Sequence, residues 1–67
     1  MEKNWVCIYS NNMMYTAEIA RNILTENNID AVVMNKKDSN YLFGAFEIYV
    51  ERDNAIRAKR LLETIED

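Results

Sequence analysis

The clearest strand in this chain is Ala45-Phe46-Glu47-Ile48-Tyr49-Val50. Its side chains alternate in character, which is typical of a strand with one face against a core. Because successive side chains of a strand point to opposite faces of the sheet, Phe46, Ile48 and Val50 are predicted to face the core. Glu47 and Tyr49 are predicted to face the other way. The strand therefore predicts a sheet with one covered face and one open face.

The segments around this strand supply two more strands and two helices. Residues 5–9 and 29–35 are rich in strand-forming side chains. Residues 13–26, and a segment that starts at the polar run 51–54 and continues to about Glu66, repeat apolar side chains at intervals of three and four, as helices do. The pair Asn27-Asn28 is predicted to end the first helix, since asparagine tolerates the left-handed conformation found at helix ends.

The order strand–helix–strand–strand–helix predicts an α+β fold in a single domain, residues 1–67. It corresponds to a βαββα ferredoxin-like two-layer sandwich that lacks the last strand, with both helices on one face of a three-stranded sheet. The missing strand leaves an unpaired sheet edge.

Composition limits the classes of function. Eight basic residues stand against eleven acidic ones, a net charge of −3, which disfavours non-specific nucleic-acid binding and an anionic membrane surface. No apolar run is long enough to span a bilayer and the N-terminus does not resemble a signal peptide, so a cytoplasmic location is expected. So short a chain has a marginal core, and with one cysteine and no histidine neither a disulfide nor a structural zinc site is expected to supplement it. Association into a homodimer is therefore predicted.

The open face of the sheet is the first candidate site. If Val6 and Ile8 point at the helices, the open face carries five side chains: Trp5, Cys7, Tyr9, Glu47 and Tyr49. Either Val32 and Met34 or Ala31 and Val33 join them from the second strand. So many aromatic side chains on an uncovered face predict a cover, either a second copy of the chain or the C-terminal residues.

An RNA platform is the alternative reading of this face, because RNA-recognition domains stack bases on aromatic residues of two strands. The pair Phe43-Gly44 echoes their third-strand motif. However, Ala45 stands where that motif needs an aromatic residue, and no basic residue begins it. The motif and the acidic charge together disfavour nucleic acid as a partner.

The irregular segment 35–44, which contains the only glycine, is the second candidate site. Lys36 or Lys37 could hold the charge of a small anionic or zwitterionic ligand, with Ser39 or Asn40 as hydrogen-bond partners. The same residues also suit a solvated turn. The apolar run Tyr41-Leu42-Phe43 either folds back onto the core or forms a contact surface.

Catalysis is not expected, and neither is a cofactor. The chain has no histidine to act as a general base near neutral pH. Cys7 is a candidate nucleophile by residue type alone, since nothing in the sequence marks a base to activate it. There is no glycine-rich phosphate-binding motif. No catalytic residue and no metal-binding residue is therefore predicted.

Several of these segments resemble a known bacterial family. They are Tyr15-Thr16-Ala17-Glu18-Ile19-Ala20 with Leu24, Asn28-Ile29-Asp30-Ala31, Asn35-Lys36-Lys37-Asp38-Ser39 and Phe43-Gly44. The family consists of short domains of unknown function labelled "putative prokaryotic signal-transducing proteins", and the resemblance runs from Trp5 to about Leu62. It implies a ferredoxin-like fold similar to that of the PII nitrogen regulators, which bind small effectors and partner proteins. Nothing like the long nucleotide-binding loop of the PII proteins is present.

Six positions of the irregular segment match the loop pattern that members of this family share: Asn35, Lys36, Asp38, Ser39, Phe43 and Gly44. With Lys37 they form the predicted ligand- or partner-binding set. Two hypotheses follow. The first is a non-enzymatic regulatory module that acts through residues 35–44 on a small ligand or a protein partner. The second is a structural homodimerisation domain that uses the open aromatic face.

Overall fold

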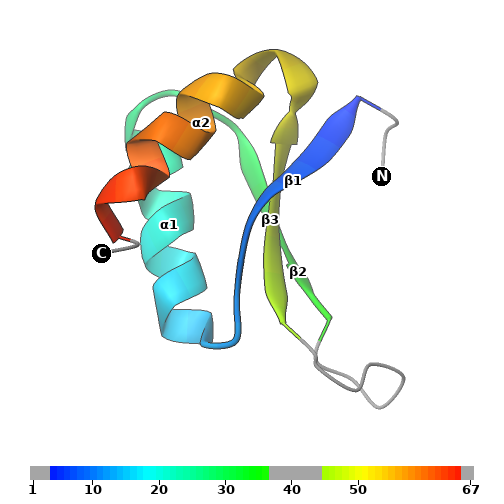
Figure 1. The fold of residues 1–67 in the computed structure, drawn as a ribbon, viewed down its shortest axis with the longest axis vertical. Coiled ribbons are helices and arrows are strands. Elements are labelled where there is room, and N and C mark those ends of the chain that lie inside the picture. Colours follow the sequence, from blue (N-terminus) through cyan, green and yellow to red (C-terminus); the bar gives the residue numbers. More distant parts are fainter. Residues whose placement is uncertain (1–3, 37–44, 66–67) are drawn as a thin grey trace.

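The computed structural model describes residues 4–36 and 45–65. The chain forms three strands and two helices, with a short 3₁₀ turn before and after the second helix: β1 (Trp5–Asn11), α1 (Met14–Glu26), β2 (Ala31–Asn35), β3 (Phe46–Glu51), η1 (Arg52–Asn54), α2 (Ala55–Leu62) and η2 (Glu63–Ile65). The sheet order is β1-β3-β2, and β3 runs antiparallel to both neighbours. Both helices lie on one side of the sheet (Figure 1). The predicted α+β fold, a ferredoxin-like sandwich without its last strand, is confirmed.

The register between β2 and β3 assigns each side chain of β2 to a face. Val33 pairs with Ile48, and Ala31 pairs with Val50. Directly opposed residues of an antiparallel pair share a face, so Ala31 and Val33 lie on the helix side with the buried strand β3 residues. Val32 therefore lies on the open face. Of the two alternatives that the sequence left open, the structure takes the one with Val32 and Met34 outside.

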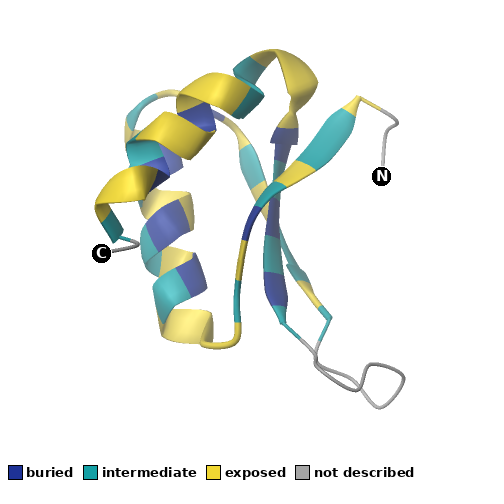
Figure 2. Cartoon of the chain, in the orientation of Figure 1, coloured by how far each residue is buried: buried dark blue, intermediate teal, exposed yellow. Residues whose placement is uncertain are grey.

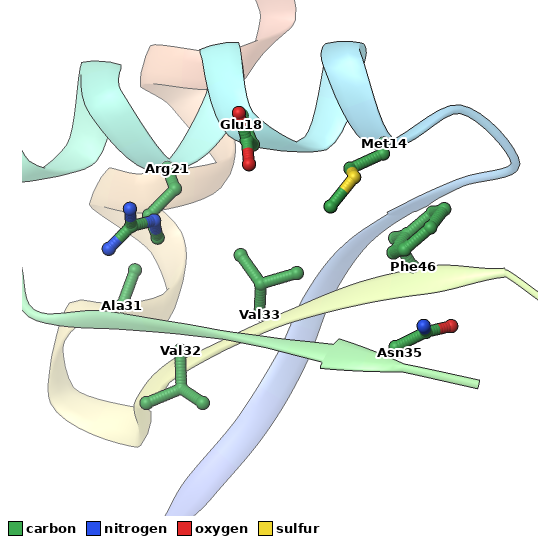
Figure 3. Close-up of a pocket in the computed structure, with 8 residues that line it drawn as sticks. All are labelled: Met14, Glu18, Arg21, Ala31, Val32, Val33, Asn35 and Phe46. Carbon is green, nitrogen blue, oxygen red and sulfur yellow. The ribbon is translucent and has the colours of Figure 1, made fainter. Parts of the chain in front are cut away.

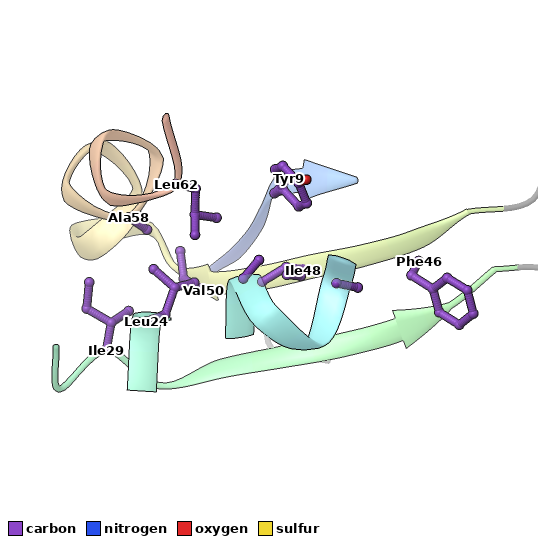
Figure 4. Packing of buried hydrophobic residues seen from close by; sticks show 10 residues of the cluster. Tyr9, Leu24, Ile29, Phe46, Ile48, Val50, Ala58 and Leu62 are labelled. Carbon is purple, nitrogen blue, oxygen red and sulfur yellow. The ribbon is translucent and has the colours of Figure 1, made fainter. Parts of the chain in front are cut away.

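The core fills the space between the helices and the sheet (Figures 2 and 4). Its buried residues are Tyr9, Ala17, Ala20, Leu24, Ile29, Phe46, Ile48, Val50, Ala58 and Leu62. Neither Ala17 nor Ala20 exposes any surface to solvent. A helix with small side chains at these positions can approach the sheet closely, since a larger side chain would have to displace strand residues that are themselves close-packed.

The prediction that Tyr9 lies on the open face is wrong. Val6 pairs with Val50 and Cys7 pairs with Tyr49, but the next pair is Tyr9 with Ile48, so one extra residue stands in β1. Such a β-bulge reverses the inside–outside alternation of the strand beyond it. Tyr9 is consequently on the helix side, where only 7% of its surface is exposed (Figure 4).

The end of α1 depends on one left-handed residue, as the sequence predicts. Asn28 has φ 64°, and the chain then turns so that the Ile29 N–H donates to the Leu24 carbonyl at 2.9 Å. The preceding Asn27 has φ −104°, and its side-chain amide donates to the Ile23 carbonyl at 2.8 Å. Ile29 is buried here as part of the turn, and the second strand begins two residues later than predicted.

Replacing Asn28 by glycine is expected to raise the free energy of unfolding by about 0.5–1 kcal/mol, because glycine adopts positive φ without the steric cost of a Cβ atom. Urea denaturation followed by circular dichroism measures the change. The matched control is Asn27→Gly, one residue earlier, which loses the side-chain bond to Ile23 and is expected to destabilise. A lower stability for Asn28→Gly would contradict this account of the turn.

Candidate functional site

A groove of about 470 Å³ lies between α1 and the outer edge of β2 (Figure 3). This volume is within the range of small-molecule sites in proteins. Its lining comes from α1, β2 and the first residue of β3: Met14, Glu18, Arg21, Ala31, Val32, Val33, Asn35 and Phe46. The groove ends at Asn35, the first residue of the predicted binding segment.

The two walls of this groove follow from the spacing of residues along α1 and β2. Met14, Glu18 and Arg21 are separated by four and three residues, so they form one strip along α1. This strip lies beside the buried stripe of Ala17 and Ala20, on the side of the helix that borders β2. The other wall consists of the helix-facing side chains of β2, with Val32 at the edge of the sheet, and Phe46 closes the floor with 9% of its surface exposed.

The charges of the groove are arranged along its length. Figure 3 shows Arg21 above Ala31 at one end, Met14 toward Phe46 at the other, and Glu18 between them on the helix. Glu18 and Arg21 are both exposed, and no described residue forms an ion pair or a hydrogen bond with either side chain. A cation and an anion above an apolar floor suit a ligand that joins a charged group to an apolar part.

Part of the predicted binding segment is placed by the structure. Asn35 pairs with Phe46 at the end of the β2–β3 ladder, and the N–H of Lys36 donates to the Ala45 carbonyl at 2.8 Å. The remaining predicted residues lie outside the described residues: Lys37, Asp38, Ser39, Phe43 and Gly44. Asn35 thus belongs both to the predicted segment and to the groove.

The open face of the sheet carries four of its five predicted residues, Tyr9 being the exception. The pairs across the sheet place Trp5, Cys7, Glu47 and Tyr49 on the face away from the helices. The hydroxyl of Tyr49 donates to a Glu47 carboxylate oxygen at 2.8 Å. Val32, 39% exposed, stands beside Tyr49 on β2. No helix or strand of the described residues covers this face.

The surroundings of Cys7 give no sign of an activated nucleophile. Its thiol is exposed and donates to the Tyr9 carbonyl at 3.5 Å. Within residues 4–36 and 45–65 there is no group of three or more histidine, cysteine, aspartate or glutamate residues that could hold a metal ion. No helix in these ranges is long and apolar enough to cross a membrane.

Sequence reasoning missed the α1 wall of the groove. Met14, Glu18 and Arg21 lie off the buried stripe and look like an ordinary outer face of the helix. One signal was present: α1 begins with Met14 and Tyr15, directly after Met13, and these apolar side chains are 56%, 73% and 57% exposed. Large apolar side chains that gather at the exposed start of a helix indicate a surface that binds a ligand or another protein.

Comparison with known proteins identifies the family. No curated protein and no solved structure matches the chain. The model of one family matches residues 5–66, nearly the whole chain, including both walls of the groove and all the strands. The chain therefore belongs to the family DUF2007, described as "putative prokaryotic signal transducing protein".

Proposed function

We propose that this chain is a non-enzymatic regulatory module of the cytoplasm that binds a small ligand or a partner segment in the α1–β2 groove and through residues 35–44. The family description favours a role in signalling. The observation that carries the proposal is the groove itself, which reaches Asn35 and places the exposed charges of Glu18 and Arg21 over an apolar floor. The absence of histidine and the isolated setting of Cys7 favour binding over catalysis.

Each wall of the groove has a role in this proposal. The Arg21 guanidinium can donate two parallel hydrogen bonds to a carboxylate. Glu18, three residues earlier on the same strip, suits an ammonium group on the same ligand. Met14, Val33 and Phe46 provide the apolar surface for the rest of the ligand. The predicted ligand is therefore anionic or zwitterionic, with an apolar part.

Two simple probes test the groove. Hexanoate has a carboxylate on an apolar chain, and L-leucine adds an ammonium group. In NMR titrations of the ¹⁵N-labelled chain, both are expected to shift the backbone amides of Val33 and Asn35. Arg21→Glu is expected to weaken hexanoate binding at least about tenfold, since it replaces a charge-assisted hydrogen bond with repulsion.

The control for this variant is Arg60→Glu, which makes the same change in net charge at an exposed position of α2. It is expected to leave both titrations unchanged. The loop is tested by Lys36→Ala combined with Asp38→Ala, which should abolish binding and leave the melting temperature unchanged. If the double variant unfolds instead, residues 35–44 have a structural role, and if Arg21→Glu binds hexanoate normally, the groove is not the site.

Homodimerisation through the open face is the second proposed function, and it is compatible with the first. It is supported by the apolar surface that Trp5, Val32 and Tyr49 leave on the side of the sheet away from both helices. Of the residues that line the groove, Val32 at the edge of the sheet also belongs to this face, whereas Ala31 and Val33 lie on the helix side. A dimer that covers the middle of the open face, around Tyr49, would therefore leave the helix-side walls of the groove accessible.

A further inference from the structure

The outer edge of β2 offers backbone hydrogen-bonding groups at known positions. The last pair of the β2–β3 register is Asn35 with Phe46, so the same register continued by one residue places Lys36 opposite Ala45. The Lys36 N–H donates to the Ala45 carbonyl at 2.8 Å. A bond between directly opposed residues marks a hydrogen-bonded pair, and such pairs alternate along an antiparallel ladder. Val32 and Met34 therefore bond to β3. Ala31, Val33 and Asn35 direct their N–H and C=O groups to the outer edge.

Within β2 itself, three usual protections against strand pairing are absent. The sequence of β2, AVVMN, contains no proline and no charged residue, and its pairing with β3 has no bulge. The opposite edge strand, β1, does contain a bulge. Within the described residues, no other segment bonds to the outward groups of Ala31 and Val33. A regular, unprotected edge of this kind is a template for an added strand.

We infer that the α1–β2 groove binds an extended peptide segment of a partner protein, which adds to β2 as a fourth strand and places alternate side chains in the groove. This inference rests on the proposed function, because it names the occupant of the same site. The side chains opposite Ala31, Val33 and Asn35 share the helix side of the sheet with them. They therefore point into the groove, beneath the strip of α1 (Figure 3).

The charges of α1 specify the sequence of this segment. An antiparallel strand, the commoner arrangement, passes Asn35 first and Ala31 last. Its first inward side chain meets Met14 and Phe46, its second meets Glu18 and its third meets Arg21. The complementary pattern from N- to C-terminus is apolar–x–basic–x–acidic, in which x is any residue directed to the open face.

A second copy of this chain fits the edge less well. Antiparallel pairing of β2 with itself about Val33 brings the two Glu18 carboxylates toward the same axis. Arg21 of each copy then faces Met14 of the other instead of a carboxylate. Each copy also carries a net charge of −3. Like charges near the centre of an interface disfavour that pairing.

The test uses the native chain and the blocked peptide acetyl-Thr-Leu-Thr-Lys-Thr-Glu-Thr-amide. Binding is followed by ¹⁵N NMR up to a peptide concentration of about 5 mM, a range that detects weak single-strand contacts. Saturable shifts are expected at Ala31, Val33 and Asn35. N-methylation of the central Lys of the peptide removes an N–H that bonds to β2, and is expected to weaken binding at least about tenfold. N-methylation of the Thr beside it, whose N–H points away from β2, is expected to change the dissociation constant less than about threefold.

The peptide of reversed sequence is the composition control, because it exchanges the groups that meet Met14 and Arg21. It is expected to bind at least about tenfold more weakly. Strand addition is overturned if the two N-methylated peptides bind equally, if the reversed peptide binds as well, or if no peptide binds while hexanoate does. In that last case the groove remains a small-ligand site. If neither peptide nor hexanoate binds, the proposed function fails as well.

Discussion

Replacing Tyr9 by alanine is expected to lower the free energy of unfolding by about 3–5 kcal/mol, the usual cost of removing a buried aromatic side chain. The bulge in β1 turns Tyr9 toward the helices, where it packs in one cluster with Ile48 and Leu62. For a chain of 67 residues such a loss is a large share of the whole stability. Urea denaturation followed by tryptophan fluorescence of Trp5 measures it.

Tyr49→Ala is the matched control, because it removes the same side chain from the opposite face of the sheet. Its expected cost is about 1 kcal/mol, from the lost bond to Glu47 and partial burial. Both variants are measured at several protein concentrations, since a dimer through the open face would make the Tyr49 effect concentration-dependent and leave the Tyr9 effect constant. Equal costs at the lowest concentration would mean that β1 has no bulge and that Tyr9 lies on the open face.

The contrast between β1 and β3 shows what the sequence can predict in this fold. In β3 apolar residues alternate with Glu47 and Tyr49, so one reading of the pattern assigns every side chain to the correct face. The five residues that begin β1 are all apolar, aromatic or small. They have no alternation that an inserted residue could interrupt. The bulge at Ile8 is therefore visible only in the pairing with β3, which is a tertiary property.

The candidate site divides in a similar way. Asn35 was predicted from its own segment, and the structure places it at the end of the groove. Arg21 and Glu18 could not be predicted, because a charged strip on a helix looks the same whether it faces solvent or borders a groove. What distinguishes the two is the position of β2 beside α1, which follows from the packing of Ala17 and Ala20 against the sheet.

Replacing Tyr49 by arginine is expected to halve the molar mass of the chain in solution, from a dimer of two 7.9 kDa protomers to a folded monomer. Tyr49 lies on the central strand between Cys7 of β1 and Val32 of β2. It is therefore at the middle of the open face. An arginine there places two uncompensated charges near the axis of a symmetric dimer. Burying them destabilises the dimer by more free energy than the apolar contact contributes. Light scattering measures the mass, and circular dichroism checks the fold.

Tyr15→Arg controls for the general effect of this substitution, because Tyr15 lies on α1 and is 73% exposed. It is expected to remain dimeric. If the Tyr15 variant dissociates and the Tyr49 variant does not, the dimer forms through the helices. If the native chain is itself a monomer, the dimer proposal fails. The open face is then the surface of a different partner, because Trp5, Tyr49 and Val32 all leave apolar surface on this side of the sheet.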